Sequence, residues 1–446
     1  MPRTPKTVLV VALGLALVAG LTALFTWAMD TQSYNTWGAL LVVPPLIALD
    51  VALLMVVIHH QRDRRIKELL GLGFVAKQIG IFGRYFVTYF IYGGTADAQR
   101  YNLYAAEHYF NWRRGIFVLA ESDKPGTQNM ELITTAIYTV IGPSALAAFF
   151  VYGSLAFWGI YLTFRAFQIA FPDADHRRYA ALVFLLPSLL YWPSSIGKEA
   201  WLALFVGVLA LGTARYFQGQ VALGIALIAI GSLGTALLRP HVTVLLVSAL
   251  FVAQVVRPTA KTSTSILTKA AGAFVLGVAG WILASQSAQF LGIDDFSWQA
   301  IADSYEYRSG NTEQGGSGFT PVPLDSPLGI PAAFMTVLFR PFPWEAVNLQ
   351  MLVQSLEGVF LIGLAIASWP RLRTVPGLLR RNPYLVFAVV YTVAFVIAFA
   401  GFGNFGILAR QRTLMLPFFL ILLCLPKPVR KRPQVIHREL VGAQSW

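Results

Sequence analysis

Residues 37–58 read WGALLVVPPLIALDVALLMVVI, and residues 59–67, which follow directly, read HHQRDRRIK. About 20 mostly apolar residues are enough for a helix to cross a bilayer, so the first stretch is long enough to span one. A basic cluster beside a span is typical of its cytoplasmic end. We therefore predict a membrane-spanning helix over 37–58 with its C-terminal end in the cytoplasm. A first span over 8–28 then places the amino terminus in the cytoplasm too.

The composition of the whole chain points to the same class. Of 446 residues, 56% are hydrophobic and only 12% are charged, and the mean hydropathy is +0.62. A soluble domain of this size cannot bury so much apolar surface, which argues against a soluble enzyme, a disordered chain and a fibrous repeat. The single cysteine, Cys424, excludes an internal disulfide framework and a cysteine-based metal site. We assign the net charge of +13 to basic cytoplasmic loops and expect no nucleic-acid partner.

Apolar stretches recur along the chain and predict an all-α fold. We expect one integral membrane domain, residues 1–446, that forms a polytopic transmembrane helical bundle of about twelve spans with both termini cytoplasmic. Short helices are expected in an outer-face loop region at 94–142. A large outer-face loop is expected at 287–348 and a basic cytoplasmic tail at 426–446. The predicted spans are 8–28, 37–58, 70–93, 144–170, 179–192, 200–214, 221–238, 242–256, 268–286, 351–367, 384–402 and 413–425.

Basic residues lie at the outer ends of several predicted spans, where the positive-inside rule disfavours them. Arginine binds phosphate through a planar, permanently charged fork, so a ring of such residues would suit a pyrophosphate whose lipid tail lies in the bilayer. Alternatively, each cation anchors at headgroup depth or pairs with an acid such as Glu199 or Glu345. The substrate-binding candidates are Lys198, Arg239, Arg308, Arg340, Arg410 and Arg412.

Two residues are candidates for proton transfer. Asp97 lies in GGTADAQRY, residues 93–101, just beyond a predicted span, where a carboxylate could deprotonate a sugar hydroxyl. A helix N-cap would explain Asp97 equally well. His241 neighbours Arg239, and its alternatives are proton transfer and a capping or interfacial role. Asp50 lies inside a predicted span and is either functional or held by a buried hydrogen bond.

Other patterns are weaker. Residues 303–320 combine Tyr, amides, hydroxyls and glycines, which suits carbohydrate binding or a flexible loop. Residues 401–406, GFGNFG, match G-x-G-x-x-G, but a dinucleotide site needs a preceding strand and a βαβ unit, so we reject it. The sequence suggests no metal site and no cofactor.

Three short motifs resemble those of Wzy-like and EpsG-like bacterial polysaccharide polymerases. They are YWPSSIGKE at 191–199, the Asp97–Tyr101 segment and the arginine-rich hairpin before the last span. GT-C-type membrane glycosyltransferases likewise carry an acid in an early outer loop. The resemblance implies pyrophosphate binding by Lys198, Arg239, Arg340, Arg410 and Arg412, with Asp97 as the base. In GT-C enzymes, however, the acid usually follows the first span and often comes as a pair, whereas Asp97 follows the third and stands alone.

The resemblance therefore implies polymerisation or transfer of an undecaprenyl-pyrophosphate-linked glycan at the outer face of the bacterial cytoplasmic (inner) membrane, which is the predicted location. The expected partners are the polyprenyl-linked oligosaccharide, the lipid bilayer and other membrane proteins of envelope biosynthesis. Two alternatives stay open. A flippase or other multi-span transporter of lipid-linked sugar would need ionisable groups at mid-depth on several helices. A scaffold without catalytic activity would need no clustered arginines.

Overall fold

The computed structural model describes residues 5–119, 125–258, 263–291, 317–321 and 328–428. These residues form an all-α fold, with one isolated bridge between Gly318 and Asn404. The elements, in chain order, are α1 (Pro5–Asp30), α2 (Tyr34–His60), α3 (Arg64–Phe86), the π-helix η1 (Val87–Ile91), α4 (Asp97–Arg113), α5 (Pro125–Ile141), α6 (Ala145–Ala170), α7 (His176–Leu185), α8 (Pro187–Tyr191), α9 (Lys198–Phe217), α10 (Val221–Leu238), α11 (Pro240–Val256), α12 (Ser263–Leu291), α14 (Gly329–Phe339), the 3₁₀ turn η2 (Pro343–Glu345), α15 (Leu349–Ala367), α16 (Trp369–Leu372), α17 (Val375–Leu379), α18 (Pro383–Phe399), α19 (Phe405–Arg412) and α20 (Leu416–Cys424).

Helix length and composition define a multi-pass membrane protein. Within the described ranges, α2, α6, α9, α10 and α15 are each long and apolar enough to cross a bilayer. Two bent pairs, α16–α17 with α18 and α19 with α20, raise the number of candidate spans from five to at most seven. The structure therefore confirms a helical multi-span protein but does not confirm twelve spans.

Several predicted spans are shorter or broken. The predicted span over 179–192 is divided between α7, of 10 residues, and α8, of 5 residues. The break falls at Pro187, which has no backbone N–H to continue the hydrogen-bond ladder of α7. The predicted span over 413–425 contains only the nine residues of α20, bent by 62° from α19. In contrast, α10 has the predicted bounds, 221–238.

The helix α6 forms the centre of the bundle, and many of its side chains are buried. It crosses α9 at very short range through two glycines. A Cβ atom on Gly159 would lie 2.3 Å from the carbonyl oxygen of Ala203, and one on Gly207 would lie 2.1 Å from that of Gly159. Small residues allow such close packing between membrane helices, and here they hold α9 in place.

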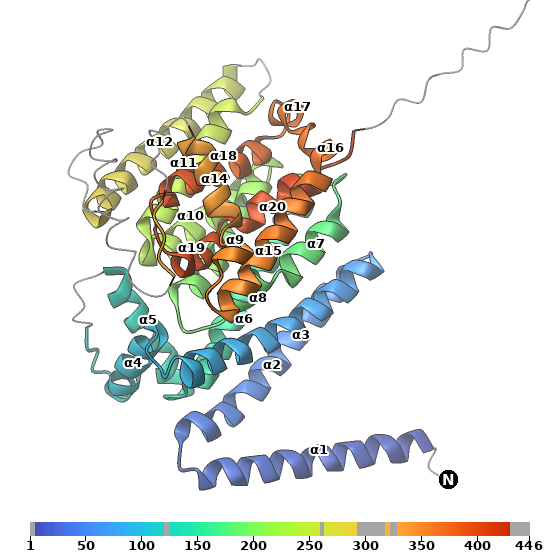
Figure 1. Cartoon of the computed structure of the whole chain (residues 1–446), viewed down its shortest axis with the longest axis vertical. Helices are drawn as coiled ribbons and strands as arrows, with labels where there is room; N and C mark the ends of the chain where they lie inside the picture. The colour runs from blue at the N-terminus through green and yellow to red at the C-terminus, as the bar shows by residue number, and fades with distance from the viewer. Residues whose placement is uncertain (1–4, 120–124, 259–262, 292–316, 322–327, 429–446) are drawn as a thin grey trace, which may run out of the picture.

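Figure 1 shows α1 lying apart from the bundle, with α2 and α3 leading back to it. The paired helices α4 and α5 lie at the end of the bundle where α3 ends. These two helices, of 17 residues each, occupy the region 94–142, where we predicted short helices. We call this end of the bundle the pocket end.

The region 287–348 was predicted as one large loop. Residues 292–316 and 322–327 lie outside the described ranges, as does 429–446 of the predicted tail. The described part contains α14, whose Val337 and Leu338 are buried in the core. The sequence analysis did not predict this helix.

Candidate functional site: a cationic pocket

A cavity of about 260 Å³ lies at the pocket end. Its lining comes from α3, α4, α5, the loop before α9, the first turn of α9, the α10–α11 turn and α19. We call it the polar pocket. Its titratable and hydroxyl side chains are Arg84, Asp97, Tyr101, Thr127, Ser195, Lys198, Glu199, Arg239 and Arg410. Four cations and two carboxylates give the lining a net formal charge of 4 − 2 = +2, so the pocket favours an anion.

Lys77 holds the loop that leads into α9. This lysine is 1% exposed, and its Nζ donates to three backbone carbonyl oxygens, at 3.4 Å from Leu189, 3.3 Å from Leu190 and 3.0 Å from Pro193. Leu189 and Leu190 lie in the last turn of α8, where carbonyl oxygens lack helical donors, and Leu190 also accepts a hydrogen bond from Oγ of Ser194. Because α9 follows directly, Lys77 positions the lining residues Lys198 and Glu199.

Glu199 lies at the centre of the charged network. Its Oε1 accepts a hydrogen bond of 3.0 Å from Nη2 of Arg239 and lies 3.9 Å from Nε of Arg410. Burial lowers the pKa of the Arg239 guanidinium, while the charge of Glu199 opposes that shift. Arg239 also donates to Oε1 of Gln411. These contacts tie the α10–α11 turn to α9 and α19.

Asp97 is the first residue of α4, and Ala96 is the N-cap. The carboxylate of Asp97 accepts a hydrogen bond of 3.1 Å from Nη1 of Arg410, and its side chain is 64% exposed. The N-cap explanation considered for Asp97 therefore does not describe its position. An exposed carboxylate at the rim of a cationic pocket is accessible to an acceptor hydroxyl.

Lys198 and Tyr101 complete the lining near Asp97. Nζ of Lys198 donates to Oγ1 of Thr127 on α5 at 3.1 Å. Burial, followed by the charges of Asp97 and Glu199, raises the pKa of Tyr101 to about 12. The phenol therefore stays protonated near neutral pH and can donate a hydrogen bond to an anion.

Arg84 is the lining cation that sequence analysis missed. It is 7% exposed, and its Nη1 donates to the hydroxyl of Tyr191 at 3.1 Å. Its Cζ lies 5.0 Å from the ring centroid of Tyr191 and 4.8 Å from that of Trp192. Its Nε has no hydrogen-bond partner, and among the described residues no acid pairs with it. Arg84 is therefore a cation of the polar pocket that no carboxylate in the described part of the chain neutralises by direct contact.

The structure does not bring every predicted residue into this lining. Arg340 pairs with Glu345, and its Cζ lies 4.5 Å and 5.0 Å from the ring centroids of Phe319 and Phe405. This is the acid-pairing alternative considered for it. His241 lies in the first turn of α11, with its ring centroid 6.1 Å from that of Phe399.

Arg412 is also outside the lining. It is 1% exposed, and its Nη1 donates to the carbonyl oxygens of Leu338 at 2.9 Å and Arg340 at 3.1 Å. These bonds attach α19 to the C-terminal end of α14. Arg308 lies outside the described residues. Of the eight predicted site residues, the polar pocket thus unites Asp97, Lys198, Arg239 and Arg410.

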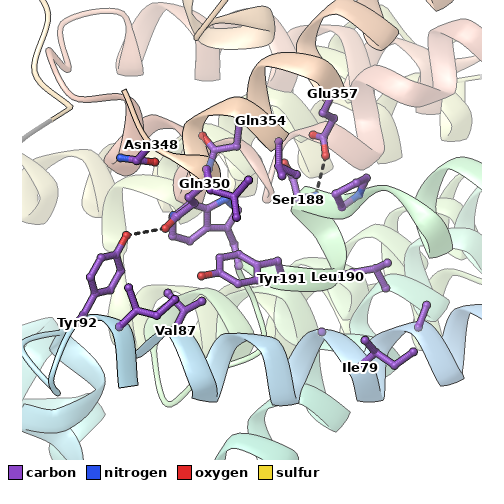
Figure 2. Close-up of a pocket in the computed structure, with 17 residues that line it drawn as sticks. Ile79, Val87, Tyr92, Ser188, Leu190, Tyr191, Asn348, Gln350, Gln354 and Glu357 are labelled. Atoms are coloured by element: carbon purple, nitrogen blue, oxygen red, sulfur yellow. Dashed lines mark hydrogen bonds between the residues drawn. The ribbon is translucent and has the colours of Figure 1, made fainter. Parts of the chain in front are cut away.

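A second cavity, of about 600 Å³, lies between α3 with η1, α8 and α15 (Figure 2). Its lining is almost wholly apolar, and we call it the apolar pocket. Exposed side chains such as Ile79, Ile91 and Leu349 line it, so it faces the surroundings of the bundle. Tyr191 and Trp192, which stack on Arg84, also line this pocket.

Among the described residues, no group of three or more His, Cys, Asp or Glu side chains could hold a metal ion. Asp50 is 3% exposed and accepts hydrogen bonds from Ser154 Oγ at 2.5 Å and Trp158 Nε1 at 2.8 Å. The second explanation considered for Asp50, a buried hydrogen bond, therefore accounts for its position.

No family model, curated protein or solved structure matches the chain. The class that fold and composition define is a helical, multi-span membrane protein with a cationic pocket at one end. The resemblance to polysaccharide polymerases stays a prediction.

Proposed function

We propose that the protein transfers or polymerises a glycan carried on undecaprenyl pyrophosphate at the outer face of the bacterial cytoplasmic membrane. One observation carries this proposal. Arg84, Lys198, Arg239 and Arg410 come from four separate segments and line one pocket, with Asp97 at its rim. In the twelve-span arrangement with both termini cytoplasmic, the pocket end is the outer end.

The proposed reaction uses the charges of this pocket. An acceptor hydroxyl attacks the anomeric carbon of the donor sugar, and the bond from that carbon to the phosphate oxygen breaks. The pyrophosphate leaves with the electron pair, and fixed cations stabilise the developing negative charge. Asp97 accepts the proton of the hydroxyl. The site holds both partners in place and thereby lowers the entropic part of the barrier.

The resting ion pairs fit this role. Arg410 contacts both Asp97 and Glu199, so an incoming phosphate competes with these carboxylates for its guanidinium. When Arg410 turns to phosphate, the Asp97 carboxylate loses the hydrogen bond from Nη1 of Arg410 and becomes free to accept a hydrogen bond from the acceptor hydroxyl. Substrate binding would therefore activate the catalytic carboxylate.

The experiment is a chain-lengthening assay. Purified protein in lipid nanodiscs is incubated with undecaprenyl-pyrophosphate oligosaccharide, and product length is measured on a gel. Arg410→Glu should abolish lengthening. The matched control is Arg114→Glu, an exposed charge reversal at the end of α4 that lies outside the pocket lining. A wild-type protein that lengthens no chains, or a fully active Arg410→Glu variant, would contradict the proposal.

A flippase or transporter of lipid-linked sugar is the second candidate, and one observation favours it. Glu357 is 5% exposed and lies well inside α15, and its Oε1 has no hydrogen-bond partner among the residues that the structure describes. Ionisable groups buried within membrane helices commonly mark transport pathways. Translocation of a fluorescent lipid-linked sugar across proteoliposomes, lost in Glu357→Gln and without any chain lengthening, would support this candidate instead.

A further inference from the structure

Arg84 lies between two cavities of opposite character. Its guanidinium contributes to the polar pocket, while the two rings that stack on it, Tyr191 and Trp192, line the apolar pocket. Gly80 and Val87, which flank Arg84 on α3 and η1, also line the apolar pocket. The cationic cavity and the apolar cavity are therefore neighbours, with Arg84 on the side of the first and the two rings on the side of the second.

The apolar pocket has the size and lining of a ligand site. A volume of about 600 Å³ falls within the usual range for small-molecule pockets, and such pockets are mostly apolar. A hydrogen bond of 2.7 Å from the Tyr92 hydroxyl to Gln350 Oε1 joins η1 to α15 at one end of it (Figure 2). At the other end Glu357 accepts a hydrogen bond of 2.7 Å from the backbone of Ser188.

We propose that the apolar pocket holds the first part of a polyprenyl chain whose diphosphate occupies the polar pocket, with Arg84 binding the diphosphate where the two cavities meet. The inference rests on the proposed function and extends it by assigning a chain-binding site and a further substrate-binding residue. The charge of the polar pocket favours the diphosphate, and the lining of the apolar pocket favours hydrocarbon over water. Arg84 lies on the polar side of this boundary, where its Nε has no hydrogen-bond partner among the described residues and its guanidinium is fixed against two rings of the apolar pocket.

The test measures equilibrium binding to the full-length protein in phosphatidylcholine nanodiscs. The probes are farnesyl diphosphate, which carries a short isoprenoid chain, and inorganic pyrophosphate, which carries none. Farnesyl diphosphate should bind at least about tenfold more tightly, because burial of its chain adds to the same ionic contacts. Equal affinities for the two probes would overturn the inference.

Two variants separate the chain from the diphosphate. Val353→Trp places a large side chain in the apolar pocket and should weaken farnesyl diphosphate about tenfold while leaving inorganic pyrophosphate unchanged. Its control is Leu352→Trp, the neighbouring residue on α15, which is 40% exposed against 44% for Val353 and does not line the pocket. Arg84→Gln should weaken both probes. If Val353→Trp leaves farnesyl diphosphate binding unchanged, the chain does not bind there.

Three further outcomes are informative. If nanodiscs containing phosphatidylglycerol compete as well as farnesyl diphosphate does, the pocket takes ordinary membrane lipid and the inference is wrong. If the chain-lengthening assay succeeds while farnesyl diphosphate shows no advantage, the inference fails and the proposed function stands. If the binding pattern appears without any chain lengthening, the proposed function fails and the chain-binding site stands.

Discussion

Arg239 and Glu199 form a nearly buried ion pair, with Nη2 of the arginine 3.0 Å from Oε1 of the glutamate and side chains only 11% and 8% exposed. The arginine belongs to the α10–α11 turn, and the glutamate to the first turn of α9. Each is a main counter-charge of the other. The pair therefore connects two helical hairpins and at the same time sets the charge of the polar pocket.

We predict that Arg239→Met destabilises the protein strongly. Loss of one partner from a buried pair costs about 3–5 kcal/mol because the remaining charge stays buried. Glu199 would keep the longer contact with Arg410, at 3.9 Å. The measurement is thermal unfolding of the detergent-solubilised protein. The double variant Arg239→Met with Glu199→Gln should recover most of the loss, and an unfolding midpoint as low as that of the single variant would contradict this account.

Lys77→Met should disturb the site without any contact to the ligand. The variant removes the donor for three carbonyl oxygens around the end of α8, and hydrogen bonds from a charged group are worth about 1.5–3 kcal/mol each. We expect lower thermal stability and weaker pyrophosphate binding together. Val75→Met, an exposed position on the same helix, is the control and should change neither. Unchanged pyrophosphate affinity in Lys77→Met would show that the lysine does not position the loop.

Asp97→Asn should separate catalysis from stability. The pair with Arg410 is partly exposed, and such pairs contribute at most about 1 kcal/mol. The free energy of unfolding should therefore change little. The rate of glycan transfer should fall by a factor of about 10²–10⁴, which is the usual contribution of a general base. Transfer at the wild-type rate would remove Asp97 from the mechanism.

Tyr101→Phe should weaken pyrophosphate binding about tenfold, because a hydrogen bond to an anion is lost. The pKa of Tyr101 is raised to about 12, so the neutral form, which donates, persists well above pH 7. The affinity ratio of wild type to variant should thus be constant from about pH 7 to pH 10. A ratio that falls to one within that range would mean that the phenol ionises there and contradict its predicted role.

Four of the six charged residues that line the polar pocket were candidates from the sequence. Lys198, Arg239, Arg410 and Asp97 all lie at helix ends that follow or precede apolar stretches, and short turns bring such ends to one depth. The pattern could not separate Arg410 from Arg412. Residues two apart on a helix point to different sides, so one lines the pocket while the other is buried against α14.

Arg84 and Lys77 were missed for a different reason. In the sequence they only interrupt an apolar stretch, which weakens the prediction of a span over 70–93. Their partners, such as Tyr191 and Pro193, lie more than 100 residues away in the chain. A buried cation inside a membrane helix is a functional candidate in principle, and applying that rule to Arg84 as well as to Asp50 would have found it.

The span count shows how tertiary structure overrides hydropathy. Long uninterrupted apolar stretches such as 221–238 are predicted to the residue. Where Pro187 divides a stretch, hydropathy alone joins the short helices α7 and α8 into one span. The span predicted over 413–425 contains a helix of only nine residues. Local backbone breaks at the pocket end are therefore what composition cannot predict.

The most direct test is a cryo-electron microscopy structure of the full-length protein in nanodiscs with undecaprenyl pyrophosphate bound. The account predicts that both phosphate groups lie in the polar pocket, in contact with Arg84, Lys198, Arg239 and Arg410. Phosphate density at another place, such as beside Arg340, with this pocket unoccupied, would contradict it.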